Sequence, residues 1–205
     1  MTNLDSLSCV LWNVRSLNNK VLDVMSYLDD KCIDIFFVTE TWLIDDNNVQ
    51  TSLIRESSCY NIFHTARKTR GGGVAIMIKP SFNAKHIHLD NFISFEVTAI
   101  LINVTFKIRL VCVYRRDCIP FATFKEEFSS FISDFIDTSI PFIICGDFNI
   151  HGILKVILKP HFLKIYWMNM VLCLVLLILK PTYQVIQLIL FLSMPLCIHL
   201  YPMCL

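Results

Sequence analysis

The feature that most restricts the fold of this chain is an apolar run from Pro141 to Cys145 that leads into the sequence Gly-Asp-Phe-Asn. Such a run predicts a buried strand that begins at Pro141 and ends at Asp147. Because side chains alternate across a strand, Asp147 and Asn149 point to one side while Phe148 packs on the other. The sequence therefore predicts a rigid strand end that presents a carboxylate and a carboxamide together.

Strand and helix patterns alternate along the first 150 residues. Apolar and alternating runs predict strands at 8–14, 33–39, 72–79 and 141–147, and a hairpin over 94–115. Helical periodicity predicts helices at 20–30 and 121–135. Helices that alternate with buried strands favour an α/β fold, and 205 residues suit one domain with a sizeable core.

Four motifs together carry a family resemblance: LWNVRSL at 11–17, FVTETWL at 37–43, VCVYR at 111–115 and GDFN at 146–149. They resemble the endonuclease/exonuclease/phosphatase family. The segments RSLNNK, TETWL and GGGVAI look like the endonuclease domain of LINE-type non-LTR retrotransposons. The resemblance covers residues 8–151 and implies a DNase I-like, four-layer α/β/β/α sandwich, incomplete at its C-terminal end, with the motif-bearing strand ends at one edge.

The resemblance implies a metal-dependent phosphodiesterase site. Glu40 corresponds to the carboxylate ligand of Mg²⁺, with Mn²⁺ as a second possibility, and Asn13 lies at the same metal site. Asp147 corresponds to the group that orients or deprotonates the attacking water, Asn149 to a hydrogen-bonding catalytic partner, and Tyr114 to a phosphate contact. Taken singly, these residues are also ordinary strand-end, turn or sheet-packing residues.

Candidate substrate contacts are basic residues beside glycines. Arg67, Lys68 and Arg70 precede the three glycines at 71–73, and Arg115 follows Tyr114. Their charges and the exposed backbone amides of the turn would meet DNA phosphates. Residues 1–150 carry 14 basic and 17 acidic side chains, a net charge of −3, so DNA binding would have to be local. A solvated turn explains the same cluster equally well.

The tail differs in composition from the body. Residues 151–205 contain four lysines, no arginine and no acidic residue. We therefore divide the chain into a partial domain at 1–151 and an apolar tail at 152–205. The apolar run at 171–179 is shorter than the ~20 residues of a membrane span, so a buried helix or an aggregation-prone segment explains it at least as well.

A frameshift explains more features of the tail than a membrane anchor does. Read two bases later, the codons of residues 166–171 spell Leu-Asp-Glu-Tyr/His-Gly, similar to a segment found downstream of GDFN in retroelement endonucleases. This reading accounts for the apolar run, the loss of acidic residues, and the absence of the late Asp-His pair that the family uses. Losing the late strands would also leave sheet edges unpaired.

The sequence thus predicts a DNA-nicking endonuclease of a non-LTR retrotransposon, as a degenerate copy with impaired activity. Its expected partners are DNA and the reverse transcriptase part of a parent polyprotein, and its expected location is intracellular, in the nucleus if functional. Nine scattered cysteines and the lack of a secretory signal agree with a reducing compartment. The alternatives are a non-catalytic, membrane-associated or binding protein, and another branch of the superfamily, acting on abasic DNA, lipid or inositol phosphates.

Overall fold

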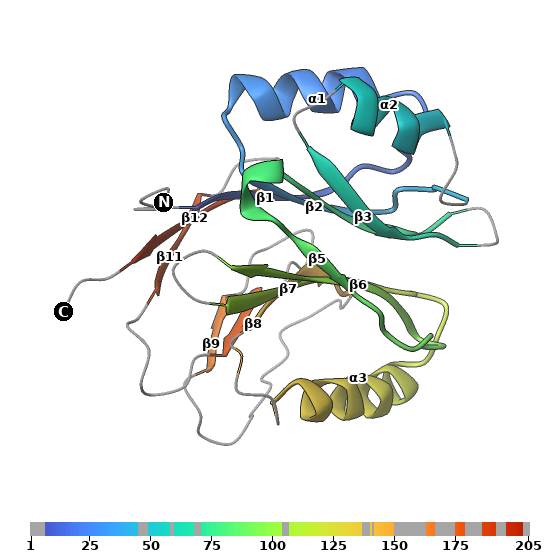
Figure 1. Cartoon of the computed structure of the whole chain (residues 1–205). Helices are drawn as coiled ribbons and strands as arrows, with labels where there is room; N and C mark the ends of the chain where they lie inside the picture. The colour runs from blue at the N-terminus through green and yellow to red at the C-terminus, as the bar shows by residue number, and fades with distance from the viewer. Residues whose placement is uncertain are drawn as a thin grey trace.

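The computed structural model describes residues 7–44, 49–57, 60–67, 71–103, 107–136, 140 and 142–149, and the course of the chain in four later strands. Two six-stranded sheets face each other (Figure 1). The first sheet has the spatial order β11 (Ile186–Phe191), β12 (Leu196–Pro202), β1 (Leu7–Asn13), β2 (Ile35–Thr39), β4 (Val74–Ile78), β3 (Asn61–Thr65). The second has the order β5 (Lys85–Ile87), β6 (Phe95–Asn103), β7 (Lys107–Arg115), β8 (Phe142–Asp147), β10 (Val175–Ile178), β9 (Leu163–Tyr166).

Helices cover the outer face of each sheet. The helices α1 (Val21–Asp30) and α2 (Val49–Ser57) lie on the first sheet, and α3 (Phe121–Ile136) lies on the second (Figure 1). A short 3-10 turn, Pro80–Phe82, follows β4. The predicted α/β/β/α sandwich of DNase I-like type is therefore confirmed.

Three apolar clusters hold the four layers together. Between the sheets, Phe37 and Ile76 pack with Leu110 and Ile143. Beneath α1, the buried side chains at i, i+3, i+4 and i+7 of the helix pack against the outer face of the first sheet, as its periodicity predicts. Seven phenylalanines dominate the third cluster and its partly buried neighbours, between α3 and the second sheet. Each sheet is thus buried on both faces.

The two sheets contain the strand pairs that matter for the site. In each sheet a parallel pair runs to the same edge: β1 beside β2, with Asn13 opposite Thr39, and β7 beside β8, with Tyr114 opposite Asp147. All the strands and helices predicted within residues 8–147 are present, with ends shifted by a few residues. The helix α2 and the strands β3 and β5 are additional to the prediction.

The tail pairs with both sheets, which corrects one expectation. Strand β12 lies antiparallel to β1, with Leu200 opposite Leu7, and β10 lies antiparallel to β8, with Leu176 opposite Ile144. Strands β1 and β8 are therefore not left as unpaired edge strands. Residues 175–178 form a strand, so of the alternatives offered for the apolar run at 171–179, the buried helix is wrong there. The division at residue 151 and the out-of-frame origin of the tail remain predictions.

Candidate active site

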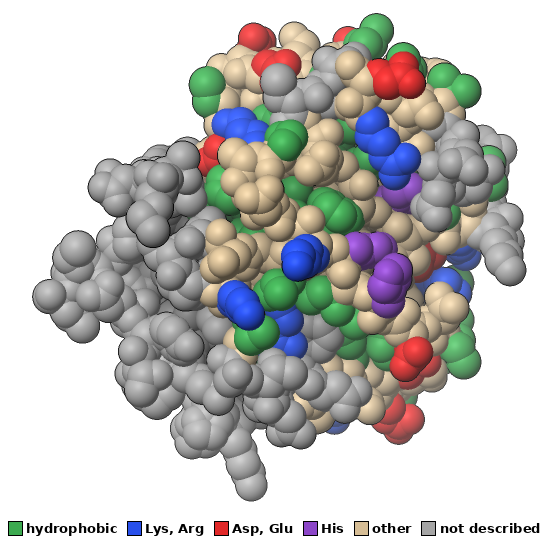
Figure 2. Space-filling view, viewed as in Figure 1, with side chains coloured by type: hydrophobic (Ala, Val, Ile, Leu, Met, Phe, Trp, Pro, Cys, Tyr) green, Lys and Arg blue, Asp and Glu red, His purple; other side chains and the backbone are tan. Residues whose placement is uncertain are grey.

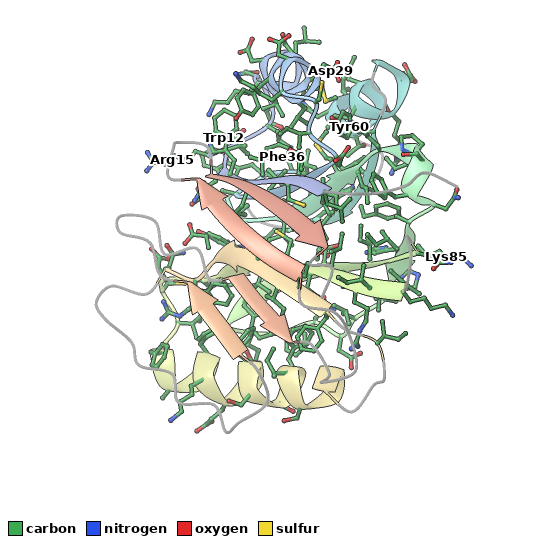
Figure 3. All side chains as sticks on the ribbon, turned by 90° about the vertical axis from the view of Figure 1, so that its left-hand side faces the viewer. Trp12, Arg15, Asp29, Phe36, Tyr60 and Lys85 are labelled. Carbon is green, nitrogen blue, oxygen red and sulfur yellow. The ribbon has the colours of Figure 1, made fainter. Side chains whose placement is uncertain are left out.

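The predicted site residues meet at one edge of the sandwich. Asn13 and Asp147 are the last residues of β1 and β8, Tyr114 is the penultimate residue of β7, and Glu40 directly follows β2. Because the parallel pairs end at the same edge, strands that are distant in sequence bring these groups together. Figure 3 shows Arg15 at the rim beyond β1, whereas Trp12 and Phe36 lie beneath the helices that cover the first sheet.

Asn13 joins the two carboxylates. Its Nδ2 donates to Glu40 Oε1 at 2.7 Å and to Asp147 Oδ2 at 2.9 Å. Its Oδ1 accepts from the backbone N–H of Arg15 at 3.2 Å, which fixes the carboxamide in this orientation. This differs from the prediction of Asn13 as a metal ligand, because a cation binds oxygen and the oxygen here faces the backbone. Asn13 instead holds two acidic side chains side by side.

Asp147 is a buried carboxylate that lies near other acidic side chains. Burial raises its pKa above the ordinary aspartate range, although hydrogen bonds from Asn13 and from the backbone N–H of Asn149 oppose this. The negative charges of Glu40 and Asp117 raise the pKa further. No lysine or arginine is among the groups that shift the Asp147 pKa in the described part of the chain. Both oxygens of Asp147 accept hydrogen bonds, so its orientation is fixed.

Tyr114 lies at the same edge, in the layer between the sheets. Its hydroxyl donates to Glu40 Oε1 at 3.4 Å. Burial raises the Tyr114 pKa far above its ordinary value, Glu40 adds to the rise, and a side-chain hydrogen bond with Asn149 opposes it. The hydroxyl therefore stays protonated at neutral pH and can act as a hydrogen-bond donor. Its place beside the carboxylates agrees with a phosphate contact and with sheet packing alike.

Asn149 and Arg115 are joined by two hydrogen bonds. Arg115 Nη1 donates to the carbonyl of Asn149 at 2.8 Å, and Asn149 Nδ2 donates to the carbonyl of Arg115 at 2.7 Å. A second nitrogen of Arg115 donates to the carbonyl of Ile119 at 2.9 Å, and the guanidinium lies over the rings of Phe121 and Phe124. Arg115 is only 6% exposed. Arg115 was predicted to contact substrate, but it is enclosed and fixes the loop of Asn149 instead.

The turn after β2 carries Glu40 in an unusual backbone conformation. Glu40 and Trp42 have positive φ angles of 55° and 57°, which non-glycine residues seldom adopt. The loop after β1 supports this turn, because the N–H of Ser16 donates to the carbonyl of Glu40 at 2.7 Å. On the other side, the N–H of Trp42 donates to the carbonyl of Gly72 at 2.9 Å. Strained backbone at a strand end is common in functional sites.

The predicted phosphate-binding turn contains all three glycines in left-handed conformations, with φ of 85°, 70° and 85° at Gly71, Gly72 and Gly73. Arg67 is partly exposed, and its Nε lies 3.5 Å from Glu96 Oε1. Lys68 and Arg70 lie outside the described residues, so their predicted role remains a prediction. The sequence analysis did not select Glu96 or Arg116, whose Nε lies 3.3 Å from the same oxygen. The sequence signal that could have identified Glu96 was its position as a glutamate within a predicted strand of mainly apolar residues.

A cavity of about 770 Å³ opens beside this edge, between β3 and the β5–β6 side of the second sheet. Its lining includes Arg67, Glu96 and Arg116 as well as His86 and His88. Figure 2 shows histidine side chains gathered on this face, close to basic ones. Asp90 is also in the lining, so acidic and basic groups offset each other in the cavity.

The residues at the edge suit a hard cation. Among the described residues, no group of three or more His, Cys, Asp and Glu side chains could hold a metal ion. The edge instead offers two carboxylates joined by one amide, with the hydroxyl oxygen of Tyr114 close by. Mg²⁺ and Mn²⁺ prefer oxygen ligands and keep several waters, so a few protein oxygens are enough.

Several solved structures share the fold of this chain. The humanised TDP2 of D. rerio superposes with a TM-score of 0.64 at 16% identity, covering 96% of this chain and 98% of the other. The human Nocturnin catalytic domain superposes with 0.68 at 12%, covering 97% and 94%. The Neisseria 3′ phosphatase NExo, bound to a DNA hairpin, superposes with 0.52 at 21%, covering 70% and 58%. No curated protein matches the sequence.

The sequence itself matches one family model over most of the region that carries the motifs. The model of the Endonuclease/Exonuclease/phosphatase family aligns with residues 10–155. That span includes every residue of the edge described above. Members of the family hydrolyse phosphodiesters or phosphate monoesters and typically depend on a divalent metal. The chain therefore belongs to the Endonuclease/Exonuclease/phosphatase family.

Proposed function

We propose that this chain is a DNA-nicking, Mg²⁺-dependent phosphodiesterase by descent, whose activity is impaired. The observation that carries the proposal is the bridge by which Asn13 Nδ2 contacts Glu40 at 2.7 Å and Asp147 at 2.9 Å. It joins the candidate metal ligand of one sheet to the candidate base of the other. The bridge places two carboxylates from different sheets on one amide nitrogen.

Charge supports a cation at this position. Two carboxylates share one neutral amide, and the burial of Asp147 makes their negative charges costly to maintain. A divalent cation beside Glu40 would offset both charges. Glu40 would hold the ion, and Asn13 would keep Glu40 in place. When bound, Mg²⁺ neutralises the charge that develops on a nonbridging phosphate oxygen; Mn²⁺ supplies the same chemistry.

The remaining residues have roles that follow from their contacts. Asp147 would orient or deprotonate the attacking water, because its carboxylate is fixed by Asn13 and by the N–H of Asn149. The protonated hydroxyl of Tyr114 would donate to a phosphate oxygen. Asn149 would act with Tyr114, since the two side chains are hydrogen-bonded. Arg67 would contact the DNA backbone from the rim, together with Lys68 and Arg70.

The finer identity comes from the sequence motifs. The RSLNNK, TETWL and GGGVAI segments support an origin in the endonuclease of a LINE-type retrotransposon, with DNA as the substrate and a reverse transcriptase as a partner in the parent polyprotein. Such a protein would act in the nucleus. The absence of acidic residues after Asp147 supports impairment, since the late Asp-His pair of the family has no counterpart in the sequence.

A second candidate, suggested by the apolar and acid-free tail, is a membrane-associated or purely binding role. No helix in the described parts of the chain is both long and apolar enough to cross a bilayer. The convergence of five polar side chains at one edge favours chemistry over simple adhesion. Detergent-dependent fractionation of the tagged chain would test this candidate: recovery in the detergent phase would support it.

A plasmid-nicking assay tests the proposal. The natural chain and a chain whose C-terminal third is restored to the in-frame sequence are each incubated with supercoiled DNA and Mg²⁺. We expect the restored chain to nick, the natural chain to nick far more slowly, and Glu40→Ala in the restored chain to lose about 100-fold or more of its rate. Equal rates for the natural and restored chains would contradict the impairment. Hydrolysis of p-nitrophenyl phosphate without nicking would instead favour a phosphatase branch.

A further inference from the structure

Glu96 is a buried carboxylate that the proposed chemistry does not use. It is the second residue of β6, its side chain is 5% exposed, and it lies opposite Tyr114 in the sheet register. Directly opposed residues of antiparallel strands point to the same face, so Glu96 shares the layer between the sheets with Tyr114. Burying a carboxylate is costly unless hydrogen bonds and opposite charges compensate it.

The compensation comes from three separate segments. Arg67, after β3, and Arg116, after β7, each place Nε near Glu96 Oε1, at 3.5 Å and 3.3 Å. The other carboxylate oxygen accepts a hydrogen bond from the backbone N–H of Gly73, before β4. Glu96 therefore joins the second sheet to a turn of the first sheet.

Two of the three glycines in that turn, Gly72 and Gly73, have no room for a side chain. A Cβ at Gly72 would lie 2.7 Å from both carboxylate oxygens of Glu96. A Cβ at Gly73 would collide with Oγ1 of Thr41. Glycine is therefore required for two reasons, close approach and positive φ. The turn is packed between Glu96 and the segment that follows Glu40.

The glycine turn also holds the backbone next to Glu40. The N–H of Thr41 donates to the carbonyl of Gly73 at 3.2 Å, and the N–H of Trp42 donates to the carbonyl of Gly72 at 2.9 Å. Glu40 has a left-handed backbone that such bonds must stabilise. A continuous chain of contacts thus runs from the Glu96 carboxylate through Gly73 and Thr41 to Glu40.

We propose that Glu96 is a positioning residue for Glu40: from the second sheet it fixes the Gly71–Gly73 turn that holds the Glu40 turn, and so keeps the Glu40 carboxylate at the metal position. The inference rests on the proposed function, in which Glu40 is the metal ligand. Groups that orient a metal ligand commonly change metal affinity by about 10- to 100-fold when they are removed.

The experiment measures Mn²⁺ binding to the full 205-residue chain by the electron paramagnetic resonance signal of the free ion. We expect Glu96→Ala to weaken Mn²⁺ binding about 10-fold or more. Glu96→Gln should lose less, because its amide oxygen can still accept from Gly73. If Glu96→Ala does not fold, the Glu96→Gln variant tests the proposal in its place. Binding by Glu96→Gln would then have to be weaker than that of the natural chain, and equal affinity would overturn the proposal.

Glu127→Ala is the matched control. Glu127 is another carboxylate that accepts backbone hydrogen bonds just before β6, from Ile93 at 3.0 Å and Ser94 at 2.8 Å, but it belongs to α3, on the outer face of the second sheet. We expect both alanine variants to melt at lower temperature by circular dichroism, and only Glu96→Ala to change Mn²⁺ affinity. Equal affinity loss in both variants, or none in a folded Glu96→Ala chain, would overturn the proposal.

Glu40→Ala separates this inference from the proposed function. If Glu40→Ala binds Mn²⁺ as tightly as the natural chain, Glu40 is not the metal ligand and the proposed function fails. If Glu40→Ala loses binding while folded Glu96→Ala retains it, only the role of Glu96 fails.

Discussion

The two halves of the candidate site are built in different ways. In the β7–β8 half, Tyr114 and Asp147 belong to regular parallel strands and are held by the sheet itself. In the β1–β2 half, Glu40 lies in a turn beyond the strand, and its neighbourhood contains positive φ angles at Arg15, Ser16, Glu40 and Trp42. One described residue of the other half, Asn149, has such an angle.

The difference teaches where each half is vulnerable. A carboxylate on a strand is positioned by many backbone hydrogen bonds and by packing on both faces. A carboxylate in a strained turn depends on a few specific supports, which here come from the loop after β1 and from Gly71–Gly73. Changes far from Glu40 should therefore disturb the β1–β2 half, whereas the β7–β8 half should fail only when the strands themselves are disturbed.

The largest effect is expected from Gly146→Ala, in the β7–β8 half. A Cβ at this position would collide with the backbone of Val113 on the neighbouring strand. The two strands would have to separate, and we expect the chain to lose about 4 kcal/mol or more of stability, or to lose cooperative unfolding. Urea unfolding followed by circular dichroism measures this. Cys145→Ala, on the same strand, should cost about 1 kcal/mol; similar losses in the two variants would contradict the close approach.

Arg115→Ala should have the next largest effect. It removes a buried guanidinium and leaves the carbonyls of Asn149 and Ile119 without these donors. We expect a loss of about 2–4 kcal/mol in urea unfolding. Arg55→Ala, on the exposed surface of α2, is the control and should change stability by less than about 0.5 kcal/mol. A loss for Arg115→Ala no greater than that of Arg55→Ala would place the guanidinium at the surface, as the sequence first suggested.

Gly73→Ala should cost about 2–3 kcal/mol, because it adds a Cβ at a φ of 85° and against Thr41. It should also weaken Mn²⁺ binding, since the Glu40 turn moves with it. The comparison of the two halves predicts that Gly146→Ala lowers the free energy of unfolding more than Gly73→Ala does. For each kcal/mol of stability lost, Gly73→Ala should weaken Mn²⁺ binding more than Gly146→Ala does. Unchanged Mn²⁺ affinity in a folded Gly73→Ala chain would show that the turn does not support Glu40.

The pH dependence of stability should reveal Asp147. Burial, with a further contribution from Glu40, raises the Asp147 pKa in the folded chain. The folded chain then holds this proton more tightly than the unfolded chain, so the stabilisation is present below the ordinary aspartate pKa and is lost as pH rises through the raised value. Urea unfolding between pH 3 and pH 7, in a chelator, should show this loss in the natural chain, and Asp147→Asn should reduce it. Identical profiles would contradict the raised pKa.

The smallest effect is expected from Lys79→Ala, at the opposite end of β4 from the glycine turn. Lys79 Nζ lies 2.8 Å from Asp34 Oδ1, and both side chains are partly exposed. Partly exposed ion pairs contribute about 0–1 kcal/mol, so we expect about 0.5 kcal/mol and no change in Mn²⁺ binding. A change in metal affinity here would mean that the whole first sheet, and not its turn, positions Glu40.

The sequence was sufficient for the architecture because the strands carry clear patterns. Long apolar runs such as 142–145, and the helical spacing of Val21, Val24, Met25 and Leu28, identify elements that are buried in the structure. The ends of parallel strands then determine which polar residues meet. The segment 49–65 has weaker patterns, because α2 is amphipathic but polar on average and β3 alternates between buried and less buried residues.

Long-range partners could not be read from the sequence. An arginine after a strand suggests a surface cation, and the burial of Arg115 depends on Asn149 and on the phenylalanines of α3. Glu96 depends on three segments that lie between 20 and 29 residues away from it in the sequence. One short-range contact was also not predictable. The orientation of the Asn13 carboxamide depends on a hydrogen bond from the N–H of Arg15, and hydrophobic periodicity does not indicate such a bond.

The most direct test of the central claim is the anomalous difference density of crystals of the full chain soaked in Mn²⁺. Our account predicts one peak at the edge where β1, β2, β7 and β8 end, within about 2.0–2.3 Å of a Glu40 carboxylate oxygen and beside Asp147. A saturated crystal with no peak at this edge, or with its peak away from Glu40, would contradict the account.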